Sequence, residues 1–183
     1  PDGPPATMNP PHPPIAEQVI VLTGASSGIG LCTAQLAAER GARVVLVARS
    51  VATLERVTER INTSGGQAMY VDADVGDRLQ MLDAARAAVA RFGRIDTWIN
   101  NAGVSIYGEM EQVPMAEARR LFDTNFWGVV HGSMVALETL KWRGGALINV
   151  GSEVSEVAVP LQAMYVASKH AVRGFTESLR QEL

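Results

Sequence analysis

Five short, almost continuously apolar segments alternate with stretches of helical period between residues 18 and 183, and this alternation strongly restricts the possible folds. The segments are Val19–Thr23, Arg43–Ala48, Ala68–Asp72, Ile95–Asn100 and Ala146–Val150. A strand that is apolar along its whole length is buried on both faces, as in a parallel sheet covered by helices. Because crossovers between parallel strands are right-handed, the pattern predicts an α/β fold with a doubly wound parallel sheet.

Three of the intervening segments carry apolar residues at helical spacing. The stripes are Ile29, Cys32, Leu36 and Ala37, then Leu54, Val57 and Ile61, then Leu82, Ala85, Val89 and Phe92. We expect each stripe to face the sheet, which would bury Cys32. Gly41, Gly65 and Gly93 follow these helices as predicted left-handed caps. Two further helices are expected at about residues 115–143, with a break near Asn125, and 163–183.

A glycine-rich turn joins the first predicted strand to the first predicted helix. Glycine lets the backbone bend sharply and approach a pyrophosphate, and the helix N-terminus offers free N–H groups and the positive end of its dipole. The turn therefore predicts a dinucleotide site in a Rossmann-like three-layer sandwich. Its candidate cofactor-binding residues are Gly24, Ser26, Ser27, Gly28, Ile29 and Gly30.

The end of the second strand indicates which dinucleotide is bound. A site that prefers NAD often has an acid here for the ribose 2′-hydroxyl. In this chain Ala48 occupies that position and Arg49 follows it. A guanidinium pairs with a 2′-phosphate, so NADP(H) is favoured over NAD(H). Asp74, after the third strand, is interpreted as facing the adenine, because no histidines accompany Asp72 and Asp74 as they would in a metal site.

Tyr165 and Lys169 form a second candidate site. Four residues apart on a predicted helix, they share one face. A neighbouring ammonium favours the phenolate and makes the tyrosine a usable acid or base. The hydroxyl of Ser152, thirteen residues upstream, could hold an oxygen that undergoes chemistry. On its own the pair would be read as an ordinary helix-surface contact, but it follows a nucleotide-binding turn.

Together these motifs resemble the short-chain dehydrogenase/reductase family in its Thr-Gly-x-x-x-Gly-x-Gly form. Three more matches support the resemblance: Asn100-Asn101-Ala102-Gly103 after the fourth strand, Asn125 in an Asn-x-x-Gly context, and the spacing from Ser152 to the Tyr-x-x-x-Lys signature. The resemblance covers essentially all of Val19–Leu183. It adds Val75, Asn101, Ala102 and Gly103 to the expected cofactor contacts, together with Tyr165 and Lys169.

The resemblance implies hydride transfer between nicotinamide C4 and a carbonyl or alcohol carbon of a small molecule. Tyr165 would exchange the proton with the substrate oxygen, and Ser152 would polarise that oxygen. Lys169 would assist the tyrosine and bind the nicotinamide ribose, while Asn125 would hold a water in a relay ending at Lys169. A homodimer or homotetramer is also implied, through helices with apolar faces. Those faces comprise Phe126, Val130, Met134 and Leu137, and Ala171, Phe175 and Leu179.

The match to the family is incomplete at the C-terminus. By the resemblance, the fold would continue past residue 183 into a sixth strand, a substrate-covering loop and a seventh strand. We therefore expect a fragment of a longer protein, with its C-terminal strands missing and the fifth strand exposed at an edge. Residues 1–14 contain seven prolines and are expected to be a flexible arm, and residues 15–183 form one incomplete domain.

Composition excludes several classes of function. The net charge of −3 gives no basic footprint for nucleic acid. No apolar run approaches the roughly 18 residues of a membrane span. One cysteine cannot form an internal disulfide and fits a reducing compartment, so a soluble, cytoplasmic protein is expected.

Two other functions remain open at this point. A cofactor-binding but non-catalytic fragment or scaffold would use the glycine turn alone. Another doubly wound enzyme, such as a nucleotide-dependent methyltransferase, would also explain the turn but leaves the Tyr165/Lys169 pair without a role.

Overall fold

The computed structural model describes residues 12–183. Its five strands form one parallel sheet in the order β3-β2-β1-β4-β5. The strands are β1 (Val19–Thr23), β2 (Arg43–Ala48), β3 (Gln67–Asp72), β4 (Thr97–Asn100) and β5 (Ala146–Asn149). The order reverses between β1 and β4, which is where ligand crevices form in such sheets. The predicted doubly wound parallel sheet is confirmed.

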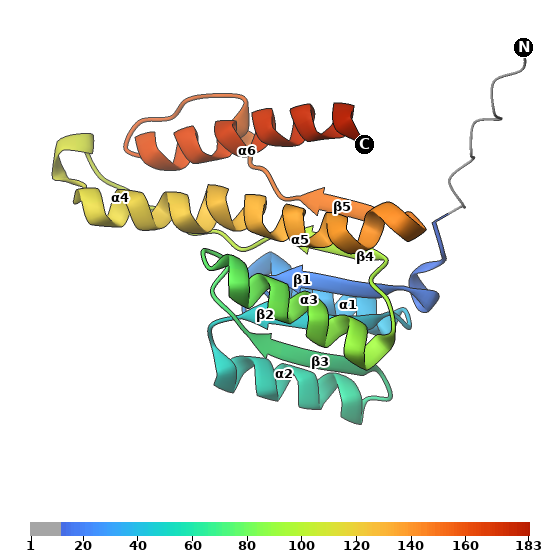
Figure 1. The fold of residues 1–183 in the computed structure, drawn as a ribbon. Coiled ribbons are helices and arrows are strands. Elements are labelled where there is room, and N and C mark those ends of the chain that lie inside the picture. The colour runs from blue at the N-terminus through green and yellow to red at the C-terminus, as the bar shows by residue number, and fades with distance from the viewer. Residues whose placement is uncertain (1–11) are drawn as a thin grey trace, which may run out of the picture.

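Helices cover both faces of the sheet (Figure 1). They are α1 (Gly28–Glu39), α2 (Val51–Thr63), α3 (Arg78–Phe92), α4 (Met115–Phe122), α5 (Gly128–Arg143) and α6 (Ala163–Glu182). Val21 and Val45 belong to a core with α3 and α5, whereas Leu22 and Leu46 belong to a core with α1 and α2. Alternate residues of each central strand therefore fill two separate cores, which explains why these strands are apolar throughout.

Short helical elements interrupt the connections. The 3-10 helices are η1 (Ile15–Glu17), η2 (Met110–Gln112) and η4 (Glu153–Ser155), and η3 (Asp123–Trp127) is a π-helix between α4 and α5. The predicted break near Asn125 is thus a π-helical turn. Such turns leave backbone groups without helical partners and often occur at functional sites.

The predicted buried stripe of α1 is wrong. Ile29 is 73% exposed, and Leu36 and Cys32 are also exposed. The helix instead buries Gly30, Ala34 and Ala38, which follow one another at intervals of four residues. Its first turn lies so close to the end of β1 that only a small-residue face fits there. Ile29 and Leu36 therefore lie on the solvent side, whereas Leu31 and Ala37 pack against the edge of the core.

The other local predictions hold better. Leu54, Val57 and Ile61 of α2 are buried as expected. In α3, Ala85 is buried but Val89 is exposed, and Met81, Ala84 and Ala88 complete the buried face. The caps Gly41, Gly65 and Gly93 have φ angles of +91°, +86° and +79°, the left-handed conformation predicted for them.

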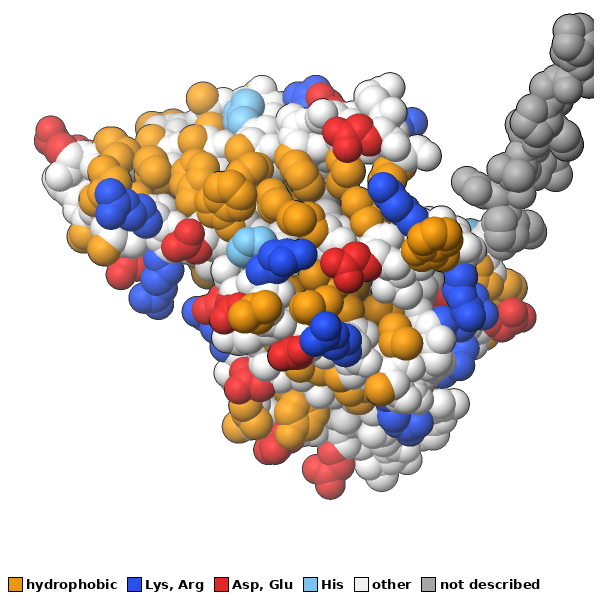
Figure 2. Space-filling view, viewed as in Figure 1, with side chains coloured by type: hydrophobic (Ala, Val, Ile, Leu, Met, Phe, Trp, Pro, Cys, Tyr) orange, Lys and Arg blue, Asp and Glu red, His pale blue; other side chains and the backbone are white. Residues whose placement is uncertain are grey.

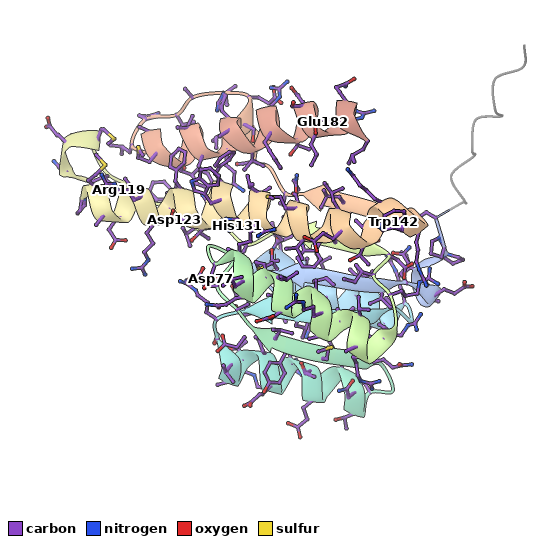
Figure 3. The ribbon with its side chains drawn as sticks, in the orientation of Figure 1. Asp77, Arg119, Asp123, His131, Trp142 and Glu182 are labelled. Carbon is purple, nitrogen blue, oxygen red and sulfur yellow. The ribbon has the colours of Figure 1, made fainter. Side chains whose placement is uncertain are left out.

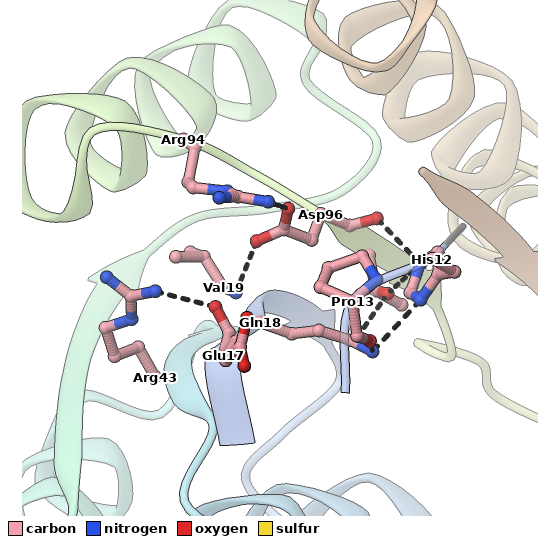
Figure 4. Close-up of polar contacts among 9 residues, drawn as sticks. His12, Pro13, Glu17, Gln18, Val19, Arg43, Arg94 and Asp96 are labelled. Carbon is pink, nitrogen blue, oxygen red and sulfur yellow. Dashed lines mark hydrogen bonds and ion pairs between the residues drawn. The ribbon is translucent and has the colours of Figure 1, made fainter. Parts of the chain in front are cut away.

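A polar cluster fixes the beginning of the described chain against the sheet (Figure 4). The side-chain amide of Gln18 donates to the carbonyl of Pro13 (2.7 Å) and lies 3.0 Å from His12 Nδ1. The buried carboxylate of Asp96 accepts from the Val19 N–H (2.8 Å) and from Arg94 Nε (2.8 Å). The predicted flexible arm falls mainly on residues 1–11, outside the described residues, whereas residues 12–14 already contact the domain.

Candidate active site

A cleft of about 470 Å³ opens at the carboxyl ends of the central strands. Twelve of the predicted cofactor residues line it: Gly24, Ser26, Ser27, Gly28, Ile29, Gly30, Arg49, Asp74, Val75, Asn101, Ala102 and Gly103. Residues separated by up to 79 positions in the sequence thus meet in one cleft. Ala48, which the sequence places at the end of the second strand, lines it too, and four further lining residues were missed from the sequence, namely Ser50, Ala73, Val104 and Thr124.

The floor of the cleft needs glycine at two positions. Gly24 has φ +68°, and a Cβ there would lie 2.7 Å from Ala102 Cα. A Cβ at Gly30 would overlap the carbonyl oxygen of Gly24 and would lie 2.5 Å from Asn101 Nδ2. The first helical hydrogen bond of α1 is donated by Leu31 to the Ser27 carbonyl (3.1 Å). The earlier N–H groups of the helix are therefore available to a ligand.

Thr23 connects the two halves of the cleft, a role that sequence reasoning missed. Its Oγ1 accepts from the N–H groups of Asn101 (3.0 Å) and Ala102 (3.1 Å). In return, Asn101 Nδ2 donates to the carbonyl of Thr23 (3.0 Å). These bonds join the end of β1 to the end of β4 across the point where the strand order reverses. The Thr-Gly and Asn-Asn-Ala-Gly motifs are thus parts of one structure.

Arg49 and Asp74 face each other at one side of the cleft. Arg49 Nη1 lies 3.7 Å from Asp74 Oδ2, and both side chains are about half exposed. The other carboxylate oxygen of Asp74 accepts from the Gly76 N–H (2.9 Å). An exposed ion pair at this distance is weak, so Arg49 can turn toward an anion in the cleft at little cost.

Val75 packs against the start of α5. A Cβ on Gly128 would lie 2.6 Å from Val75 Cγ2, so α5 can approach this residue closely only because it starts with glycine. The Val75 carbonyl lies 3.2 Å from Nδ1 of His131, which Figure 3 labels on α5 near Asp77. His131 therefore contacts the wall of the cleft.

Lys169 lies at the centre of the second candidate site. Although it is a lysine, it is only 5% exposed, and its Nζ donates to the carbonyl of Val150 (2.9 Å). The same Nζ lies 6.0 Å from the centroid of the Tyr165 ring. Burial disfavours the charged form and lowers the pKa of Lys169. The pair is therefore a half-buried phenol and a buried ammonium rather than a surface contact.

Asn125 is fully buried in the π-helix beside this pair. Its Nδ2 donates to the Val104 carbonyl (2.8 Å) and to Ser168 Oγ (3.2 Å), and its Oδ1 accepts from the Val104 N–H (2.8 Å). Ser168 Oγ in turn donates to the Tyr165 carbonyl (2.7 Å). The Asn125 amide therefore fixes the chain after β4 and contacts the helix that carries Tyr165. Ser168 was missed, although it lies inside the Tyr-x-x-x-Lys motif.

Ser152 is half-buried two residues beyond the carbonyl that binds Lys169. Its Oγ accepts a long bond from the Val154 N–H (3.4 Å), and its own N–H donates to Ser155 Oγ (3.1 Å). This reciprocal arrangement is a capping box at the start of η4. Ser155, buried and also missed from the sequence, holds the backbone of Ser152 in position.

The described residues, 12–183, also bear on two other kinds of structure, a membrane-spanning helix and a metal site. No helix there is both long and apolar enough to cross a bilayer. In the same part of the chain, no three His, Cys, Asp or Glu side chains gather as metal ligands would.

Comparison with known proteins gives consistent relatives. The profile of the short chain dehydrogenase family matches residues 18–183. The uncharacterized oxidoreductase YxnA of Bacillus subtilis is 47% identical over 171 residues, which are 92% of this chain and 48% of that protein. An uncharacterized oxidoreductase of Methylorubrum extorquens is 40% identical over 167 residues, covering 91% of this chain and 67% of its own length.

Solved structures agree with the fold described above. The alcohol dehydrogenase of Thermococcus sibiricus, complexed with 5-hydroxy-NADP, has a TM-score of 0.87 and 30% identity over 90% of this chain and 71% of its own. A short chain dehydrogenase/reductase of Burkholderia phymatum in complex with NAD also has a TM-score of 0.87, with 32% identity over 91% of this chain and 60% of its own.

This chain spans about half the length of the Bacillus subtilis relative and about two thirds of the Methylorubrum extorquens one. The family match covers nearly every described residue and leaves no reason to retain the methyltransferase alternative. The chain belongs to the short chain dehydrogenase family.

Proposed function

We propose that this chain forms the cofactor-binding and catalytic part of an NADP(H)-dependent oxidoreductase that interconverts a carbonyl and an alcohol. The observation that carries the proposal is the buried Lys169, bonded to Val150 and close to the Tyr165 ring, beside a cleft built for a dinucleotide. Burying a lysine is unfavourable, so a buried lysine next to a phenol suggests a functional site.

The cleft fits a dinucleotide on its own geometry. Close packing at Gly24 and Gly30 brings the turn against Asn101 and Ala102, while Gly28 has open space where a side chain would project. We assign the pyrophosphate to this turn and to the free N–H groups of α1. When bound, the cofactor supplies or accepts a hydride, that is, two electrons with one hydrogen nucleus, at nicotinamide C4.

Side chains of the protein would transfer the proton to or from the substrate oxygen. In the reductive direction, Tyr165 Oη gives its proton to the substrate oxygen as the carbonyl becomes an alcohol, and in oxidation it takes the proton back. The Ser152 hydroxyl would donate a hydrogen bond to that oxygen. Lys169 would stabilise the phenolate that remains on Tyr165 and bind the nicotinamide ribose. Asn125 would support a water-mediated path to Lys169.

The preference for NADP(H) rests on Arg49. Its partner Asp74 is on the same side of the cleft and holds it only weakly. Ala48, next to it, leaves no acid at the end of β2 to repel a 2′-phosphate. Of the two solved relatives above, one binds an NADP derivative and the other NAD, so the local charges are the basis for the choice.

We also propose that the chain assembles into a homodimer or homotetramer through α5 and α6. Apolar side chains gather over these helices in Figure 2. The Phe126 ring packs edge-on against Phe175, with 6.3 Å between the ring centroids, and against the exposed Trp127; Met134 of α5 is also exposed. The single cysteine is consistent with a reducing compartment, and the cytoplasm is the proposed location.

The test is NADPH oxidation with a panel of ketones, comparing the protein with its Tyr165→Phe variant. We expect the variant to bind NADPH normally, measured by fluorescence, and to lose about a hundredfold or more in rate. Full activity in the variant would refute the proposed acid. Binding of NADPH without any turnover would instead support the non-catalytic alternative.

A further inference from the structure

Two loops flank the proposed reaction centre, residues 104–114 before α4 and residues 150–162 before α6. They are joined where the Gly108 N–H donates to the carbonyl of Leu161 (2.9 Å). Leu161 has φ +65°, an uncommon backbone conformation for a residue other than glycine. Figure 1 shows the two loops at the same end of the molecule, where α6 begins. Together they form one surface beside Tyr165.

This surface is apolar. Several large apolar side chains on it are exposed, including Tyr107 at 73% and Leu161 at 52%. A small hollow between the loops is lined by Ile106, Gly108, Met110, Val113, Leu161, Ala163 and Met164. Ala163 and Met164 of this hollow belong to the first turn of α6, the helix that also carries Tyr165. Contiguous exposed apolar surface is found more often at binding sites than elsewhere on a protein.

The charges on the same loops all have one sign. Residues 104–114 contain Glu109 and Glu111, and residues 150–162 contain Glu153 and Glu156, without any Lys, Arg or His. Arg173 of α6 reaches Glu156, but it also donates to Glu177 (2.8 Å), so two carboxylates already surround it. Lys169 donates to the Val150 carbonyl and is only 5% exposed, so it lies below this surface and not on it. An anionic group of a substrate would therefore find repulsion here instead of a partner.

We propose that the site takes apolar carbonyl compounds that are neutral or cationic, and disfavours those with a carboxylate or phosphate. The inference rests on the proposed function, because it assumes that the substrate carbonyl lies at Tyr165 and Ser152. Contact with the apolar side chains would bury the apolar part of the substrate and so lower the free energy of the complex. The glutamates raise the free energy of any anion beside them and lower that of a cation.

Three ketones of similar shape test this on the purified protein. They are methyl 4-acetylbenzoate, 4-acetylbenzoate and (4-acetylphenyl)trimethylammonium, which are neutral, anionic and cationic. The measurement is kcat/KM from NADPH oxidation at neutral pH. We expect the neutral and cationic ketones to exceed the anionic one by about tenfold or more. An anion equal to or better than the neutral ester would overturn the substrate inference alone. No turnover of any of the three would overturn the proposed function and this inference with it.

Charge variants separate electrostatics from shape. The double variant Glu111→Gln/Glu153→Gln should raise the anion-to-neutral ratio of kcat/KM severalfold. The matched control Glu59→Gln removes one carboxylate from α2, away from both loops, and should leave the ratio unchanged. A ratio that is unchanged in the double variant would show that these carboxylates do not select the substrate.

Discussion

The Nζ of Lys169 donates a 2.9 Å hydrogen bond to the carbonyl oxygen of Val150, which attaches the middle of α6 to the end of β5. Tyr165 precedes this lysine by one helical turn, and Ser152 follows the carbonyl by two residues. One buried ammonium therefore sets the relative position of the two elements that carry the proposed acid and its hydroxyl partner. Because Lys169 is buried, its protonation should affect the free energy of unfolding, which can be measured as a function of pH.

Replacing Lys169 by Met should flatten the pH dependence of stability in the alkaline range. Burial lowers the pKa of Lys169 in the folded protein below its value of about 10.4 in the unfolded chain. Between these two values the unfolded chain binds more protons, so the free energy of unfolding of the unmodified protein rises with pH. The measurement is urea unfolding at several pH values up to 10. The exposed Lys141 provides the control Lys141→Met, and equal pH dependence in both variants would contradict the prediction.

Arg49→Asp should reverse the cofactor preference. The substitution removes the proposed partner of the 2′-phosphate and places a second carboxylate beside Asp74. We expect NADPH binding to weaken by about tenfold or more, because charge-assisted hydrogen bonds are worth about 1.5–3 kcal/mol. NADH binding should be retained. Fluorescence titration of both cofactors measures this, with Arg86→Asp on the exposed side of α3 as the control. Unchanged NADPH affinity would exclude the role of Arg49.

Thr23→Val should damage the cleft without changing its volume. The valine has the same shape but cannot accept the N–H groups of Asn101 and Ala102, which lie 3.0 and 3.1 Å from the hydroxyl. Leaving such groups unpaired costs about 1–3 kcal/mol in the free energy of unfolding, and dinucleotide binding should weaken as well. Thr23→Ser keeps the hydroxyl and should behave nearly like the unmodified protein in urea unfolding. A loss of stability in Thr23→Ser without a loss in Thr23→Val would contradict the prediction and point to the methyl group instead.

Local patterns predicted the positions of all five strands well, although only the central strands are buried along their length and Ile148 of the edge strand β5 is 45% exposed. They failed for α1, where the close approach of Gly30 to Gly24 and Asn101 reverses the ordinary preference for large side chains in the core. Motif order brought together the twelve cleft residues and the Tyr165/Lys169 pair. Thr23 and Ser168 were missed because their roles consist of hydrogen bonds to segments 78 and 43 residues away. Hydrogen bonds between residues so far apart cannot be predicted from the periodicity of the sequence.

A pair of glycine substitutions separates close packing from helix propensity. At Gly30 an added Cβ would overlap the Gly24 carbonyl oxygen and lie 2.5 Å from Asn101 Nδ2, and backbone cannot move aside as a side chain can. Gly30→Ala should therefore destabilise the fold by about 1–3 kcal/mol and weaken NADPH binding, since overpacking shifts the turn itself. At Gly174, within α6, an added Cβ meets nothing within 4 Å. Gly174→Ala should stabilise the protein by about 0.5–1 kcal/mol, because alanine favours the helix interior. Urea unfolding and NADPH titration of both variants would decide. If Gly30→Ala binds NADPH normally, the turn does not require the close contact that its motif implies.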